Sequence, residues 1–327
     1  MRVLVTGGAG YVGSFTVRDL LAAGHEPLVV DNLSSGRREA VADVPLTVAD
    51  VRDKDGLREV FRRFRPRAVL HFAGLKSSQE SLTDITTYYD VNVVGTHHVL
   101  AACADTGVER FVFSSSCAVY GTPPACPVDE SAPIRPESPY GETKYLGERM
   151  IASYADVTGM RHASLRYFNA AGADPDRALG EYTGASSGQL LPAAVRAALG
   201  RTPGIEVFGQ DHPTPDGTAL RDYVHVVDLA RAHVRVLDHL DTTPWSGVVN
   251  LGAGRPVSVR ELLDTVRSVS GRDFDIRPAP RRPGDPGASW ADPTLARERF
   301  GWKPEHGLDA VVRTAWAWHT SVPTSLG

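Results

Sequence analysis

The chain lacks the features that would place it in a membrane, outside the cell or on nucleic acid. It has only three cysteines in 327 residues, none in a CxxC pair, so we expect no disulfide framework and a reducing, cytoplasmic environment. No apolar run approaches membrane-spanning length, and glycines interrupt the first one, at residues 3–5, too early for a signal peptide. The formal net charge of −4 favours neither nucleic acid nor an anionic membrane as a partner.

Lysine and metal-ligand patterns are scarce as well. Lysine occurs at only four positions, which are residues 54, 76, 144 and 303. Two of these fall in the motifs described below. The adjacent His97 and His98 would point to different sides of a helix, and the sequence contains neither zinc-ligand spacing nor an HExxH motif. We therefore expect no metal.

The N-terminal segment has the pattern of a dinucleotide-binding unit. A buried strand is expected at 2–6, a glycine-rich turn at 7–13, a helix to about residue 23, and a second strand at 27–30 that leads into Asp31. Asp31 should accept hydrogen bonds from the adenosine ribose and repel a 2′-phosphate, which favours NAD over NADP. A tight turn without a ligand is the less favoured interpretation.

Three glycines of this turn have separate physical reasons. Gly7 permits the tight turn, Gly10 lets the backbone approach a pyrophosphate, and Gly13 lets the helix and the strand pack closely.

The alternation of strands and helices continues to about residue 168. Further strands are expected at 46–51, 68–72, 111–114, 161–167, 205–208, 248–251 and 274–276, and helices at 55–64, 81–106, 138–157, 189–199, 226–240 and 308–319. The alternation predicts an α/β fold, a Rossmann-type doubly wound parallel sheet with ligands at the carboxyl ends of its strands. We expect an NAD-binding domain at 1–168 and a smaller C-terminal α/β substrate-binding domain mainly at 169–327, some of whose segments return to the first sheet.

The stretch that carries the chemistry is Ser138-Pro139-Tyr140-Gly141-Glu142-Thr143-Lys144. Pro139 suits the first turn of a helix, on which Tyr140 and Lys144 then share one face. A nearby ammonium favours the phenolate and brings the phenol pKa, about 10 when free, toward neutrality. A serine of the run 114–116 could relay a substrate proton to Tyr140. Taken alone, a chance pair on a solvated helix face would be the better interpretation, and turn serines usually serve the backbone.

With these motifs in view, the chain resembles the extended short-chain dehydrogenase/reductases and, among them, the UDP-hexose 4-epimerases. The blocks that carry the resemblance are residues 5–13, 31–33, 71–76, 88–90, 113–121, 138–144, 166–169, 216–218, 221–225, 250–254 and 290–292. Their common order and spacing are specific. The resemblance implies an isomerase that keeps NAD tightly bound and interconverts UDP-glucose and UDP-galactose through a transient 4-keto sugar. It also implies a homodimer formed through the helices at 81–106 and 138–157.

The resemblance assigns roles to individual residues. Catalysis would rest on Tyr140, Lys144 and Ser116. The residues expected to contact NAD are Gly7, Gly10, Tyr11, Val12, Gly13, Asp31, Asn32, Asp50, Val51, Phe72, Ala73, Gly74, Lys76, Asn92, Ser114, Tyr140, Lys144 and Tyr167. Those expected to contact the UDP-sugar are Lys76, Ser116, Tyr140, Asn169, Gln189, Leu190, Arg221, Arg282, Asp285 and Ser289. In this assignment, Arg221 and Arg282 grip the diphosphate with their guanidinium forks.

Departures from the family pattern bear on the substrate. Cys117 and Ala118 stand where sugar-nucleotide 4,6-dehydratases carry an Asp-Glu pair, so dehydration is not expected. Ser289 stands where narrow-specificity epimerases carry a tyrosine, and our hypothesis is a roomier pocket that also admits UDP-N-acetylglucosamine and UDP-N-acetylgalactosamine. The unusual segment 181–189 leaves another NDP-sugar, such as UDP-glucuronate or a specialised sugar, as an alternative. A non-catalytic NAD-binding regulator is a further alternative, against which the intact catalytic set counts.

Overall fold

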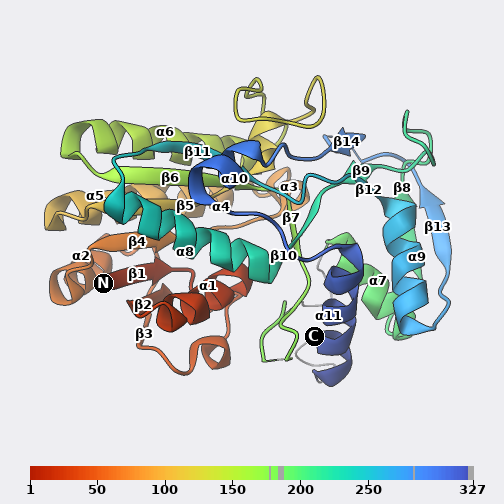
Figure 1. The fold of residues 1–327 in the computed structure, drawn as a ribbon, viewed down its shortest axis with the longest axis horizontal. Helices are drawn as coiled ribbons and strands as arrows, with labels where there is room; N and C mark the ends of the chain where they lie inside the picture. Colours follow the sequence, from red (N-terminus) through yellow and green to blue (C-terminus); the bar gives the residue numbers. More distant parts are fainter. Residues whose placement is uncertain (177, 183–187, 283, 323–327) are drawn as a thin grey trace.

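A seven-stranded parallel sheet forms the centre of the computed structural model, which describes residues 1–176, 178–182, 188–282 and 284–322 (Figure 1). The strand order is β11-β6-β5-β4-β1-β2-β3. The strands are β1 (Arg2–Thr6), β2 (Glu26–Asp31), β3 (Leu46–Val48), β4 (Ala68–His71), β5 (Arg110–Ser116), β6 (Arg161–Tyr167) and β11 (Gly247–Leu251). From β1 the strand order runs outward through β2 to β3, and from β4, on the other side of β1, it runs outward in the opposite direction. Doubly wound sheets bind ligands at such a switch point, here between β1 and β4. The expected fold class is confirmed.

Helices cover both faces of this sheet. Alternate side chains of a strand point to opposite faces, and β1 shows this directly. Val3 and Val5 pack in the cluster that includes α1 (Tyr11–Ala22) and α8 (Val226–Thr242). Leu4 packs in the cluster on the other face, whose helices are α2 (Lys54–Phe64), α5 (Gly95–Thr106) and α6 (Pro139–Thr158). α1 and α8 lie side by side on one face (Figure 1).

A smaller α/β part lies beyond the carboxyl edge of the sheet (Figure 1). Its helices are α7 (Leu190–Ala198), α9 (Val259–Ser270) and α11 (Leu308–Ser321), which share one apolar core. Its strands are β8 (Ile205–Phe208) with β13 (Ile276–Ala279), and β9 (Leu220–Arg221) with β12 (Val257–Ser258) and β14 (Ala288–Ser289). The pair β7 (Asn169–Ala171) and β10 (Tyr223–His225) lies between the two parts. α10 (Thr294–Phe300) packs back on α8 and β11.

Most expected elements are present, with differences that have local causes. The segment expected as one helix at 81–106 is broken into α3 (Ser78–Ser81), α4 (Ile85–Tyr89), a π-helical turn (Asp90–Val94) and α5. Asp84 caps α4 by accepting a hydrogen bond from the Thr87 N–H, which starts a new helix there. The strand expected at 46–51 ends at Val48, and the one expected at 274–276 is β13, at 276–279. Short 3₁₀ turns occur at Arg38–Val41 and Cys117–Tyr120.

Helix α9 was not foreseen, although its sequence carries a helix signal. Ser258 accepts a hydrogen bond from the Glu261 N–H at 2.9 Å, the arrangement of an N-terminal capping box. Leu262, Leu263 and Val266 then recur at helical spacing and are buried. Helix α10 and the two-residue strands β9, β12 and β14 were also missed, because their pairing is set by segments distant in the sequence. The boundary expected at 168/169 stays a prediction.

Candidate active site

The turn after β1 is built from glycines that accept no side chain. Gly7 has φ +69°, and a Cβ on it would lie 2.4 Å from the Ala73 nitrogen in the loop after β4. A Cβ on Gly13 would lie 2.4 Å from the Gly7 carbonyl oxygen, so Gly13 lets α1 pack on the turn itself. Gly10 is the N-cap of α1, and no described side chain caps the helix. The first N–H groups of α1, at Tyr11 and Val12, are therefore available to an anion.

Asp31, at the end of β2, binds the backbone of the glycine turn that follows β1. Its carboxylate accepts hydrogen bonds from the Ala9 N–H at 3.0 Å and the Leu33 N–H at 2.8 Å. Burial raises the pKa of this carboxyl, while the two backbone N–H groups oppose the shift. Its position at the strand end, beside the glycine turn, is the one that a ribose-binding carboxylate needs.

An ionic cluster follows at the ends of β2 and β3. The Asn32 amide donates to Asp50 at 2.8 Å, and Arg52 donates to Asp50 at 2.9 Å and to Asp90 at 3.1 Å. Arg52 therefore holds the pKa of Asp50 well below its usual value. Val51, expected to contact NAD, is buried in the core cluster that includes α5, so its side chain serves packing. Arg52 was not foreseen, although it directly follows the Asp50-Val51 pair.

The loop after β4 is tied to helix α6 through Asn92. The Asn92 side chain accepts from the Leu75 N–H at 2.8 Å and donates to the Leu75 carbonyl at 3.1 Å and to the Thr143 hydroxyl at 3.0 Å. A Cβ on Gly74 would come within 3.0 Å of the Asn92 Oδ1 and 3.5 Å of the Lys144 Nζ. The π-helical turn carries Asn92 into this position. Gly74, Asn92 and Lys144, chosen separately from the sequence, are thus neighbours.

Tyr140 and Lys144 lie on the buried face of α6. The helix begins as expected, with Pro139 in its first turn and the Ser138 hydroxyl accepting from the Gly141 N–H at 3.2 Å. Tyr140 is 9% exposed and Lys144 is 5% exposed. The Lys144 Nζ donates to the Ser114 carbonyl at 2.8 Å and lies 6.0 Å from the centroid of the Tyr140 ring. The bland interpretation, a solvated pair, is therefore wrong.

Burial shifts the pKa values of Tyr140 and Lys144 so that the neutral form of each side chain is favoured. It raises the pKa of Tyr140 to about 12, against the lowering effect of the hydrogen bond with Ser116. It lowers the pKa of Lys144 to about 8. Lys144 in the chain alone therefore loses its proton before Tyr140 does. The expected fall of the phenol pKa is therefore not present in the chain alone, because desolvation by burial is the largest influence on Tyr140.

Tyr167, at the end of β6, has a partner that the sequence did not indicate. Its hydroxyl hydrogen-bonds the Nε2 of His233, a buried residue of α8. The His233 Nδ1 donates to the Leu229 carbonyl at 2.8 Å, so Nε2 carries no proton and accepts from Tyr167. Burial lowers the pKa of His233 to about 4, which keeps the ring neutral. The Phe72 ring lies against His233, with 4.7 Å between centroids.

Residues expected to bind the sugar and phosphates come from the smaller part. Arg221 of β9 is paired with Asp285 at 2.5 Å, and in the parallel β9–β14 pair it stands opposite Ser289, which is buried. The Arg221 charge also acts on the thiol of Cys117, next to Ser116. Arg282 instead stacks on Phe208, 3.6 Å from the ring centroid.

Glu181 connects two of the expected residues, Lys76 and Gln189, and was itself missed. The Lys76 Nζ donates to it at 2.8 Å, and the Gln189 amide nitrogen lies 2.8 Å and 2.9 Å from its two carboxylate oxygens. Leu190 follows Gln189 as the first residue of α7. Residues 183–187, part of the segment that departs from the family pattern, lie outside the described residues.

Asp222 is a further residue that sequence reasoning missed. It is fully buried, and its carboxylate accepts from the N–H groups of Ala253 at 2.6 Å, Gly254 at 3.0 Å and Ala291 at 3.1 Å. Burial raises its pKa to about 6. The backbone of Asp222 also accepts from the Asn169 N–H at 2.8 Å. It therefore joins β7 to the segments that carry Ser289 and the 250–254 block.

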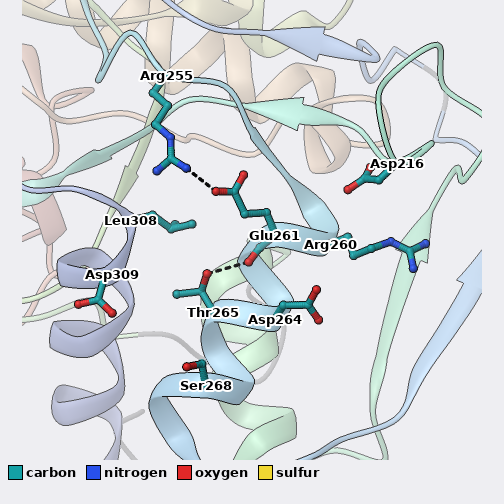
Figure 2. Close-up of a pocket in the computed structure, with 9 residues that line it drawn as sticks. All are labelled: Asp216, Arg255, Arg260, Glu261, Asp264, Thr265, Ser268, Leu308 and Asp309. Atoms are coloured by element: carbon teal, nitrogen blue, oxygen red, sulfur yellow. Dashed lines mark hydrogen bonds and ion pairs between the residues drawn. The ribbon is translucent and has the colours of Figure 1, made fainter.

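A hollow of about 630 Å³ lies elsewhere, beside α9 and α11 (Figure 2). Its lining residues are Asp216, Arg255, Arg260, Glu261, Asp264, Thr265, Ser268, Leu308 and Asp309. None of the expected site residues lines it. Its Arg255 and Glu261 are already paired at 2.5 Å (Figure 2). We assign it no role in the chemistry.

The described residues offer neither a metal site nor a membrane-spanning helix. No group of three or more His, Cys, Asp or Glu side chains there is arranged to hold a metal ion. In the same part of the chain, every helix is too short or too polar to cross a membrane.

Comparisons with known proteins place the chain in a family. The model of the NAD dependent epimerase/dehydratase family matches residues 3–252. The UDP-glucose 4-epimerase of Rhizobium meliloti (strain 1021) is 46% identical over 319 residues, which cover 98% of this chain and 97% of that protein. A UDP-glucose 4-epimerase structure from Stenotrophomonas maltophila, with bound NAD and formylated UDP-arabinopyranose, superposes with a TM-score of 0.95 at 39% identity and 98% coverage of both chains. The UDP-Glc/GlcNAc 4-epimerase of Campylobacter jejuni superposes with a TM-score of 0.86 at 36% identity, covering 98% of this chain and 99% of that one. The chain therefore belongs to the NAD dependent epimerase/dehydratase family.

Proposed function

We propose that the chain is an NAD-dependent UDP-hexose 4-epimerase, an isomerase that interconverts UDP-glucose and UDP-galactose through a transient 4-keto sugar. The observation that carries the proposal is the cluster of Tyr140, Lys144 and Ser116, buried at the carboxyl edge of the sheet and adjoining the glycine turn through Gly74. The relatives named UDP-glucose 4-epimerase match this chain over nearly its full length. The match therefore includes the segments around the glycine turn and those of the smaller part.

The residues around the glycine turn fit NAD. A Cβ at Gly7 or Gly13 would clash with the backbone that shapes the turn, and the uncapped start of α1 presents N–H groups to a pyrophosphate. Asp31 would hold the adenosine ribose, with Asn32 and Asp50 at the adenine end. Asn92 and Ser114 would position Lys144 at the nicotinamide end of NAD. The other residues proposed to contact that end are Phe72, Ala73, Gly74, Lys76 and Tyr167. When bound, NAD⁺ accepts the hydrogen at C4 of the sugar together with its electron pair and later returns it.

Tyr140 handles the proton of the same reaction. Its phenolate would take the proton of the sugar 4-hydroxyl as the C4 hydrogen leaves, and its phenol would return that proton when the hydrogen comes back to the other face. Ser116 would hold the 4-oxygen, since its hydroxyl already bonds that of Tyr140. Burial favours the neutral phenol, so the phenolate depends on positive charge close by. Lys144 and the oxidised nicotinamide ring supply that charge together.

The smaller part would grip the nucleotide and leave the hexose loosely held. A diphosphate would compete with Asp285 for the guanidinium of Arg221, and Arg282 would close on it from its place on Phe208. Lys76, Asn169, Gln189 and Leu190 would line the remaining contacts. A loose hexose can turn over and present its other face, as epimerisation requires.

Ser289 would set how bulky the sugar can be. Its side chain is short and buried in β14, opposite Arg221. We propose that this leaves room for an N-acetyl group at C2, so that UDP-N-acetylglucosamine and UDP-N-acetylgalactosamine are also substrates. The structural likeness to the Campylobacter jejuni UDP-Glc/GlcNAc 4-epimerase is consistent with that range.

We further propose a cytoplasmic homodimer that pairs α5 and α6 of one subunit with those of another. The outer face of α6 has a shallow, mostly apolar hollow lined by Leu146, Arg149, Met150, Ser153 and Tyr154. The Tyr154 hydroxyl hydrogen-bonds His97 of α5 at 3.2 Å, so the two helices present one surface. Sedimentation equilibrium of the protein and of a Met150→Glu variant tests this, because a buried charge should dissociate the dimer.

The function is tested by incubating the purified protein, without added cofactor, with UDP-galactose and separately with UDP-N-acetylgalactosamine. Products are separated by chromatography or identified by NMR. Conversion of both supports the epimerase, the retained NAD and the roomy pocket, whereas conversion of UDP-galactose alone supports the epimerase and refutes the pocket. If neither reacts with NAD⁺ supplied, other NDP-sugars such as UDP-glucuronate become the candidates. Tyr140→Phe is the inactive control.

A further inference from the structure

A buried ion pair lies directly behind the catalytic cluster. Glu148 is one helical turn beyond Lys144 on α6, and Arg166 is on β6 next to Tyr167. Their side chains are 6% and 4% exposed. The Arg166 guanidinium donates through Nε at 2.9 Å and through a terminal nitrogen at 2.6 Å, one bond to each carboxylate oxygen. The pair is thus bidentate and closed to water.

The pair also binds the strands on either side. The Ser115 hydroxyl, on β5, donates to Glu148 at 2.5 Å. The second terminal nitrogen of Arg166 donates to the Tyr120 hydroxyl at 2.9 Å, which in turn donates to the Asn250 Oδ1 of β11 at 2.8 Å. One network therefore joins α6, β5, β6 and β11 at the edge of the sheet that carries the site.

Ser115 stands between Ser116, a residue of the catalytic cluster, and Ser114, which binds Lys144. The carbonyl of Ser114 is the acceptor for the Lys144 Nζ, and the hydroxyl of Ser116 bonds Tyr140. Because adjacent residues of a strand move together, any displacement of Ser115 displaces both neighbours. The bond from Ser115 to Glu148 therefore sets where the end of β5 lies relative to Tyr140 and Lys144 on α6.

Stability alone is a weak reason for such a pair. Replacing both partners of a buried ion pair by apolar residues is often neutral for stability, because the pair attraction barely repays the desolvation. Its geometric precision is the more useful property, since two parallel hydrogen bonds and a third from a strand hydroxyl allow only one arrangement.

We propose that Glu148 and Arg166 are positioning residues that hold the end of β5 against α6, so that Ser114 and Ser116 meet Lys144 and Tyr140 in register. The inference rests on the proposed function, because it assigns the pair to the Tyr140 proton transfer. Glu148 has an additional effect on charge, since its carboxylate favours the protonated form of Lys144. The other charged or titratable groups facing Glu148 are Arg166 and His162 of β6, and Tyr120 through Arg166.

The sharpest test is Ser115→Ala, which leaves the ion pair intact and cuts only its link to the strand. Arg166→Met removes the pair, and the Glu148→Met, Arg166→Met double variant removes it without leaving an unpaired buried charge. We expect kcat for UDP-galactose to fall about 10-fold in Ser115→Ala and about 100-fold in both others, because displacement of about 1 Å in a reacting group costs rates of this size. KM should change less than about threefold, since the nucleotide contacts are elsewhere.

Two variants on the same strands serve as matched controls. Ser164→Ala removes a buried serine hydroxyl from β6. Arg110→Met removes an arginine that is 3% exposed at the opposite end of β5, where it pairs with Glu109 at 2.8 Å and with Asp241. Both should keep kcat within about twofold of the parent, although Arg110→Met should lower the melting temperature as Arg166→Met does.

A spectroscopic measurement tests the positioning role independently of the proposed function. The phenolate absorbance of Tyr140 is titrated in the NAD-containing protein, with Tyr140→Phe as the blank. We expect its pKa to rise in Ser115→Ala and Arg166→Met and to be unchanged in the two controls. Unaltered kcat and titration in Ser115→Ala and the double variant, or equal losses in the controls, overturn the inference. Failure of the parent protein to convert any UDP-hexose instead overturns the proposed function, and the titration still decides the positioning role.

Discussion

Replacing Lys144 by methionine should lower kcat about 100-fold near neutral pH, and the size of this effect follows from the structure. Burial raises the Tyr140 pKa to about 12, so at pH 7 only about one phenol in 10⁵ would be ionised without help. The Lys144 Nζ lies 6.0 Å from the Tyr140 ring. While Lys144 is protonated, which requires a pH below its pKa of about 8, its charge at about that distance stabilises the phenolate by about 2.8 kcal/mol, or about two pKa units, with an effective dielectric constant of about 20.

The pH dependence of the rate shows in which direction the Lys144 charge acts. Lys144 loses its proton as the pH rises through about 8, so the advantage of the parent over the variant should be largest below that pH and should shrink above it, while the rate of the variant climbs about tenfold per pH unit. Initial rates of UDP-galactose conversion at saturating substrate, measured from pH 6 to about pH 10, give both profiles. The NAD content of each preparation must be measured and restored, because Lys144 is also expected to hold the cofactor. Lys54→Met, at an exposed position at the start of α2, is the matched control.

The reasoning fails if Lys144→Met, fully loaded with NAD, loses less than about threefold in kcat. It fails as well if the loss is equal at every pH and the phenolate titration of Tyr140 is unchanged. In that case Lys144 would serve to hold the cofactor only, and its charge would have no part in the proton transfer.

Three further predictions concern other parts of the molecule. Ser289→Tyr should abolish turnover of UDP-N-acetylgalactosamine and spare that of UDP-galactose in a product assay. Equal losses for both substrates would refute the proposal that Ser289 sets how bulky the sugar can be. Asp31→Asn should narrow the preference for NAD over NADP at least about tenfold in binding titrations, because a like charge no longer opposes the 2′-phosphate. Burial lowers the pKa of His71 to about 3, so between that value and about 6.5 the unfolded state binds more protons than the folded state. The free energy of unfolding should therefore fall as the pH drops through this range, by up to about 4 to 5 kcal/mol from this residue, and His71→Gln should flatten the fall in pH-dependent calorimetry.

Local rules were enough for the two motifs that define the site. The turn at Gly7 needs a positive φ, and the helix from Pro139 needs a cap and a four-residue spacing between Tyr140 and Lys144. Each of these conditions involves neighbours within a few residues, so the sequence alone determines them. The same holds for the alternation of strands and helices, from which the doubly wound sheet was predicted.

The environment of those motifs was decided only by the tertiary structure. His233 reaches Tyr167 from 66 residues away, and Glu181 meets Lys76 across 105 residues. Asp222 binds backbone groups that no periodicity brings to it. The pKa of Tyr140 in the chain alone lies above its ordinary value, against the expectation, for the same reason. Desolvation depends on everything that packs around a group, and that packing is formed by segments from the whole chain.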